Sequence, residues 1–104
     1  MTAPRYLNFR GYSDVEPYEV VKVISPITVE IRPMKATLAP DWRPEMVPGG
    51  FSVVTVNNYD QRWVIESDPT APTTRARLGK KGWKSRYGFH SADDVPRKFY
   101  DYNF

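Results

Sequence analysis

The chain has 104 residues, of which 40% are hydrophobic and 14% aromatic, so it has the length of one domain and is too apolar for a disordered segment. With no cysteine and one histidine, it cannot form disulfides, thiolate zinc sites or cysteine nucleophiles, and an intracellular site is favoured. The net charge of +3 is unevenly distributed. Residues 1–72 carry seven Lys/Arg and nine Asp/Glu (−2), whereas residues 73–104 carry eight Lys/Arg and three Asp/Glu (+5). This asymmetry indicates an anionic partner, the alternative being that the charge serves only solubility.

No apolar run approaches the roughly 18–20 residues that cross a bilayer, and residues 1–6 lack the apolar segment of a signal peptide. We therefore expect a single domain over residues 1–104 without membrane association. Ten prolines, spread along the sequence, leave no room for a long helix, so short strands are expected.

The first half of the chain predicts a hairpin followed by a loop. Residues 18–25 are rich in valine, and in residues 27–34 Ile27, Val29 and Ile31 alternate with polar residues, which predicts two strands that pair across Ser25-Pro26. Residues 35–50, with three prolines and Gly49-Gly50, predict a long proline-rich loop, in which Trp42 is expected to plug the core rather than contact a partner.

Strands are also predicted over residues 51–56 and 61–66, separated by an Asn-rich turn at residues 57–60. In the second of these strands, Trp63 and Ile65 should share a face.

Residues 74–78 predict a fifth strand. In it, Arg75 and Arg77 should share one face, and Ala76 and Leu78 the opposite face. A turn at residues 79–82 and a sixth strand over residues 83–89 follow, and then a short helical turn over 91–97 with Ser91 as N-cap.

These elements predict a mainly β fold, a small antiparallel barrel or sandwich of five to six short strands. The C-terminal run, which has four aromatic residues in its last six, should dock as a closing strand, the alternative being an anchor for a partner.

Catalytic and metal-binding groups are scarce. His90 is the only histidine, and its neighbours Ser91, Asp93 and Asp94 are adjacent in sequence only, which does not orient a catalytic triad. We expect a surface or turn histidine, no enzymatic activity, no cofactor and no metal site.

The strongest functional signal is the segment from Arg75 to Arg86, which has six positive residues and no acid. Cations neutralise phosphates and aromatic rings stack on bases. The predicted partner or nucleic-acid site comprises the cations and two interleaved aromatics: Arg75, Arg77, Lys80, Lys81, Trp83, Lys84, Arg86 and Tyr87. The alternative is a solvated hairpin with Trp83 in the core.

Five runs carry a family resemblance: residues 18–23 (YEVVKV), 28–34 (TVEIRPM), 61–63 (QRW), 77–84 (RLGKKGWK) and 98–104 (KFYDYNF). From about residue 12 onward the chain resembles short, largely uncharacterised bacteriophage and prophage accessory proteins. The resemblance implies a non-enzymatic, anti-CRISPR-like inhibitor in the cytoplasm of a bacterial host cell. It would bind a CRISPR nuclease or related nucleoprotein, as a monomer or weak dimer, and block DNA binding or cleavage.

A net basic chain is a poor mimic of DNA, so such an inhibitor would bind an acidic patch, a guide RNA or a complementary groove. The first alternative is a small nucleic-acid-binding β-barrel that uses the hairpin at residues 75–86. The second is a structural or assembly component of a phage particle.

Overall fold

The computed structural model describes residues 3–11, 13–44, 46–49, 52–55 and 61–100, with the backbone alone for 46–49 and 52–55. These ranges contain eleven strands and no helix, and thus no helix that could cross a membrane. The strands, in chain order, are β1 Tyr6–Arg10, β2 Val15–Glu16, β3 Tyr18–Ser25, β4 Thr28–Pro33, β5 Lys35–Leu38, β6 Met46–Gly49, β7 Ser52–Thr55, β8 Trp63–Glu66, β9 Thr74–Gly79, β10 Gly82–Ser85 and β11 Gly88–Asp93.

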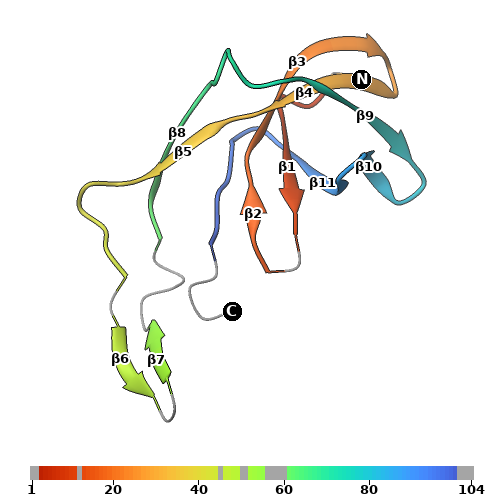
Figure 1. Cartoon of the computed structure of the whole chain (residues 1–104). Coiled ribbons are helices and arrows are strands. Elements are labelled where there is room, and N and C mark those ends of the chain that lie inside the picture. Colours follow the sequence, from red (N-terminus) through yellow and green to blue (C-terminus); the bar gives the residue numbers. More distant parts are fainter. Residues whose placement is uncertain (1–2, 12, 45, 50–51, 56–60, 101–104) are drawn as a thin grey trace.

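Six antiparallel strands close into a barrel in the order β1–β11–β10–β9–β4–β3, and β2 adds a strand to β1 (Figure 1). The predicted mainly β fold is confirmed, and of the two predicted architectures the barrel is the one that forms. The pairing between β1 and β3, which closes the barrel, is short. Tyr6 lies opposite Glu19, and the Val20 N–H donates to the Arg5 carbonyl at 3.0 Å. The sequence analysis missed β1, because two consecutive buried residues, Leu7 and Asn8, break the period-two pattern.

Buried side chains from four barrel strands form the core. The buried cluster consists of Leu7, Val29, Ile31, Ala76 and Trp83. The predicted inward face of β4 is therefore confirmed at two of its three positions. The third, Ile27, lies in the turn before β4 and is 41% exposed.

The predicted hairpin forms, with β3 and β4 joined by a turn at Pro26 and Ile27, where the Ser25 hydroxyl accepts a hydrogen bond from the Ile27 N–H. The prediction of one long loop over residues 35–50 is wrong, because β5 and β6 lie in it. The polar and proline-rich composition of residues 35–50 made β5 difficult to predict. β5 alternates exposed and half-buried residues and pairs with β8. Together the two strands leave the barrel as a two-stranded ribbon (Figure 1).

Trp42 is buried, as predicted for a core plug. Trp63 and Ile65 of β8 are both half-buried between exposed neighbours, which confirms that they share a face. The predicted strand over residues 51–56 is represented by β7, paired with β6, and the predicted turn at residues 57–60 lies outside the described residues.

The C-terminal elements differ from the prediction. Residues 83–89 are not one strand, because a turn at Arg86 and Tyr87 separates β10 from β11. The predicted helical turn over 91–97 is also wrong: Ser91 belongs to β11 and pairs with Asn8 of β1 instead of capping a helix.

Beyond β11 the chain docks on the barrel. The buried Asn8 donates from Nδ2 to the Val95 carbonyl at 3.2 Å and accepts from the Arg97 N–H at 2.9 Å. Phe99 then forms a two-way backbone bridge with Val15 of β2, each bond 2.9 Å long. The C-terminal segment thus docks as far as Tyr100, but through an isolated bridge and not as the predicted closing strand, and residues 101–104 lie outside the described part.

Candidate functional site

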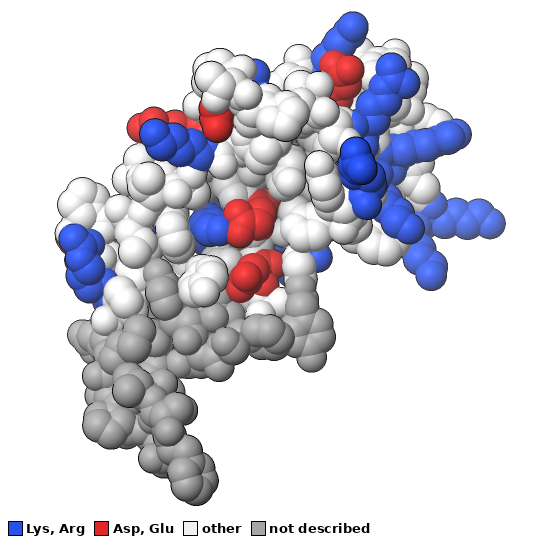
Figure 2. All heavy atoms as spheres, in the orientation of Figure 1, with Lys and Arg blue, Asp and Glu red and all other residues white. Residues whose placement is uncertain are grey.

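The β9–β10 hairpin carries most of the predicted cations and points them away from the core. Arg75, Arg77 and Lys84 are exposed on the outer face of the sheet, whereas Ala76 and Trp83 between them are buried. The remaining cations are exposed in the two turns that flank β10. We call the six exposed cations the basic face: Arg75, Arg77, Lys80, Lys81, Lys84 and Arg86. Figure 2 shows Lys and Arg side chains projecting from this end of the barrel.

Glycines set the two turns that present these charges. Gly82 follows the Lys80-Lys81 turn with φ +114°, and Gly88 follows the Arg86-Tyr87 turn with φ +140°, both in a region that other residues rarely adopt. At Gly88 a side chain would also be crowded, because a Cβ there would lie 3.2 Å from Cε2 of Phe9.

None of the six cations of the basic face belongs to an ion pair among the described residues. The four ion pairs among the described residues all lie elsewhere, such as Arg32–Glu19 at 2.7 Å and Arg97–Asp93 at 2.5 Å. In the strand register the acid next to the face is Glu30 of β4, opposite Arg75. Six exposed cations on one hairpin give this end of the barrel a positive electrostatic potential.

The two predicted aromatic site residues fall in different places. Trp83 is 8% exposed, so it belongs to the core and is not a surface contact. This is the alternative that the sequence analysis gave for Trp83. Tyr87 is 56% exposed, and the Arg86 guanidinium lies 5.7 Å from its ring centroid.

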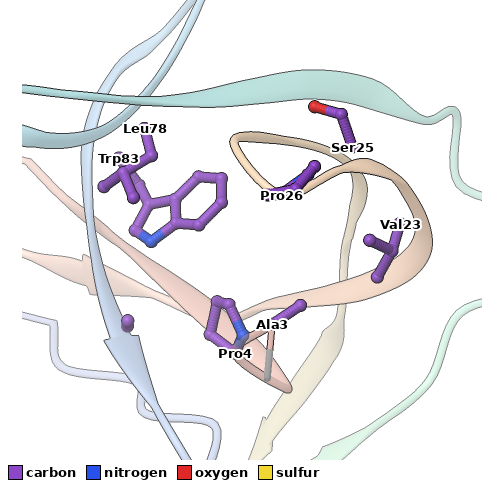
Figure 3. Close-up of a pocket in the computed structure, with 8 residues that line it drawn as sticks. Ala3, Pro4, Val23, Ser25, Pro26, Leu78 and Trp83 are labelled. Atoms are coloured by element: carbon purple, nitrogen blue, oxygen red, sulfur yellow. The ribbon is translucent and has the colours of Figure 1, made fainter. Parts of the chain in front are cut away.

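Trp83 also lines an apolar pocket of about 460 Å³ at one end of the barrel (Figure 3). Its other walls come from small and apolar residues: Ala3, Pro4, Val23, Ser25, Pro26, Leu78 and Ala92. None of these lining side chains carries a charge.

The sequence analysis missed Phe89, which completes the site. Phe89 of β11 lies opposite Lys84 of β10, is 42% exposed, and has the Lys84 ammonium 5.3 Å from its ring centroid. Treating residues 83–89 as one strand hid this pairing. The Arg86-Tyr87-Gly88 run is a turn signal that would have placed Phe89 beside Lys84.

His90 is not the surface or turn histidine that the sequence predicted. It is 6% exposed, and its Nε2 lies 2.7 Å from Oγ of Ser85, whereas Nδ1 lies 2.9 Å from the Leu7 carbonyl. A carbonyl only accepts, so Nδ1 carries the proton and Nε2 accepts from the Ser85 hydroxyl. Burial lowers the pKa of His90, although the bond to the Leu7 carbonyl opposes the shift.

A serine hydroxyl bonded to a histidine is the start of a hydrolytic triad, but the third member differs here. Triads orient the histidine with a carboxylate, whereas Nδ1 of His90 donates to a backbone carbonyl. The nearby Asp93 carboxylate accepts from the side chain of Arg97 and from the backbone N–H groups of Asp94 and Val95. The Ser85–His90 pair therefore joins β10, β11 and β1 as a structural network.

No group of three or more potential metal ligands occurs among the residues that the structure describes. Fold and site together define a small antiparallel β-barrel with a basic outer face. Comparison with protein-family models, with curated proteins and with solved structures finds no match. Function is therefore inferred from the geometry and the sequence pattern of this chain.

Proposed function

We propose that the chain is a non-enzymatic binding protein whose basic face contacts the phosphate backbone of a nucleic acid. The observation that carries the proposal is the set of six exposed cations that have no carboxylate partner among the described residues. Lys and Arg that neutralise phosphates release condensed counterions, which is the main source of sequence-independent affinity for nucleic acid.

The scaffold favours this use of the charges. β10 is paired on both sides, with β9 and with β11, so the strands that carry Arg77 and Lys84 are fixed in the barrel wall. Charges held by a preformed surface lose less conformational freedom on binding than charges on a flexible tail. The cations of the two turns extend the face beyond both ends of β10, which suits an extended, charged backbone better than a small anion.

Charge reversal tests the proposal. The affinity of a fluorescein-labelled 20-nucleotide strand is measured by anisotropy for the wild type, for Lys80→Glu/Lys81→Glu, and for the control Lys35→Glu/Arg62→Glu on the β5–β8 ribbon. Both pairs of exposed residues change the net charge equally. We expect the first pair to weaken binding by roughly tenfold or more and the control to have a much smaller effect. Equal losses in the two variants, or no binding by the wild type, would contradict the proposal.

A second candidate is the anti-CRISPR-like inhibitor implied by the resemblance of residues 77–84 and the other four runs. In that function the basic face would contact the guide RNA or the target DNA held by a CRISPR nuclease. A cleavage assay with the assembled nuclease and guide tests it: the wild type should protect the target and Lys80→Glu/Lys81→Glu should not. Full cleavage in the presence of the wild type would exclude this function for the nuclease tested.

The third candidate, a component of a phage particle, requires self-association or contact with another protein. Val23, Ile24 and Ile27 at the β3–β4 turn are 55%, 40% and 41% exposed, and exposed apolar side chains favour a protein contact where they form one patch. Sedimentation velocity at micromolar concentration tests it, and a monomer at all concentrations would count against it.

A further inference from the structure

We infer, on the basis of the nucleic-acid function proposed above, that the partner is a single strand and that one of its bases stacks on Phe89. The base would occupy a hollow in the basic face beside the β9–β10 turn. The argument uses the strand register, the exposure of Phe89 and the charges around it.

The hollow exists because two glycines face each other next to a row of large side chains. The register aligns Arg77, Lys84 and Phe89 across β9, β10 and β11, and the next pair on the same face of β9 and β10 is Gly79 opposite Gly82. The resulting depression has a volume of about 450 Å³ and is lined by Arg77, Leu78, Gly79, Lys80, Lys81, Gly82, Lys84, Ser85 and Phe89. A Cβ built at either glycine would meet no atom within 4 Å, so the space is open.

Phe89 supplies the apolar face of this hollow. It is 42% exposed on a surface that is otherwise charged, and burying its ring would be favourable. Base stacking on aromatic side chains tolerates any sequence and strengthens binding by about fivefold or more per base. The Lys84 ammonium lies 5.3 Å from the centroid of this ring, and Lys80 and Lys81 line the same hollow, so their charges could meet the phosphates next to the stacked base.

A single strand fits this arrangement better than a duplex. In a duplex the flat faces of the bases are occupied by their neighbours, so a duplex could offer only phosphates to the cations and would leave Phe89 uncovered. Tyr87 does not share the role, because it lies in the turn at the other end of β10 and does not line the hollow.

Two independent variants test the inference. Phe89→Leu removes the aromatic face and keeps an apolar side chain, whereas Gly79→Val fills the hollow without touching Phe89. The backbone at Gly79 accepts a side chain, since its φ is outside the left-handed region. Binding is measured with poly(dT), poly(U) and a DNA duplex of equal length, and the control is Val64→Ala, which shortens an equally exposed apolar side chain of β8 outside the basic face. We expect both variants to bind the single strands about fivefold or more weakly and to bind the duplex as the wild type does.

The outcomes separate the inference from the proposed function. If Lys80→Glu/Lys81→Glu leaves binding unchanged, the nucleic-acid function itself is wrong. If that variant weakens binding but Phe89→Leu and Gly79→Val bind single strands like the wild type, stacking on Phe89 is wrong and phosphate binding stands. A duplex bound at least as tightly as the single strands would also overturn the inference. Thermal unfolding of each variant shows that it is folded, and comparing poly(dT) with poly(U) tells DNA from RNA.

Discussion

Acidification should destabilise the barrel through His90. The folded protein holds this side chain neutral, because burial lowers its pKa below the ordinary value of 6.5 and Nε2 accepts a hydrogen bond from Ser85. The unfolded chain takes up a proton as the pH falls through 6.5, whereas the folded chain does so only at lower pH. The unfolded state then binds more protons, so the free energy of unfolding falls as the pH decreases below about 6.5.

The structure sets the size of this effect. If His90 stays neutral in the folded state, lowering the pH from 7.5 to 5.5 reduces the free energy of unfolding by at most about 1.4 kcal/mol. For a domain of about 100 residues this corresponds to a fall in Tm of up to roughly 6–11 °C. Asp68 and Asp93 also have lowered pKa values, caused mainly by hydrogen bonds from Thr70 and Arg97, but they are lowered from 3.8 and their contribution is lost only at more acid pH.

Urea unfolding at pH 5.5, 6.5 and 7.5, followed by tryptophan fluorescence, measures the effect. The control is His90→Gln, which removes the titrating group, so its free energy of unfolding should vary much less over this range even though it is less stable throughout. A wild type that is as stable at pH 5.5 as at pH 7.5, or an equal pH dependence in His90→Gln, would refute the assignment of a buried neutral imidazole.

Three further substitutions test the packing. Asn8→Ala removes both hydrogen bonds that hold residues 95–97 on the barrel and should lower the free energy of unfolding in urea by about 2 kcal/mol. Asn8→Asp should not recover the full stability, because its carboxylate cannot donate to the Val95 carbonyl. Trp83→Ala empties the core beneath the basic face and should cost about 3–5 kcal/mol by the same measurement; a loss below 1 kcal/mol would show that Trp83 is not a core residue. Glu19→Gln leaves the half-buried Arg32 without its carboxylate partner, 2.7 Å away, and should lower Tm by about 4 °C or more, whereas an unchanged Tm would show that this ion pair adds nothing.

Sequence patterns predicted the strands whose two faces differ. Val29 and Ile31 alternate with polar residues because one side of β4 faces the core, and Arg75 and Arg77 alternate with Ala76 for the same reason in β9. Of the strands that were missed, β1 lacks such a pattern. β1 buries Asn8 beside Leu7. Asn8 lies inside because it forms hydrogen bonds with backbone groups of residues 95 and 97, which are too distant in sequence for a local pattern to predict.

The candidate site was predicted in part for the same physical reason. Exposed cations in a hairpin are evident from composition, and the structure places all six of them on the surface. Trp83, Phe89 and His90 depend on which strands pair across the barrel, and pairing is a long-range property. Once the turn before Gly88 is recognised, the register β10–β11 puts Trp83 and His90 inside and Phe89 outside beside Lys84.

The salt dependence of binding to a single-stranded oligonucleotide tests most directly whether the basic face contacts phosphates. The logarithm of the affinity falls with the logarithm of the salt concentration with a slope of about −0.7 per phosphate contact, so six contacts would give about −4. We predict that the wild type approaches this slope and that Lys80→Ala/Lys81→Ala reduces its magnitude by about 1.4. A slope near zero, or the same slope in the variant, would contradict a phosphate-binding role for this face.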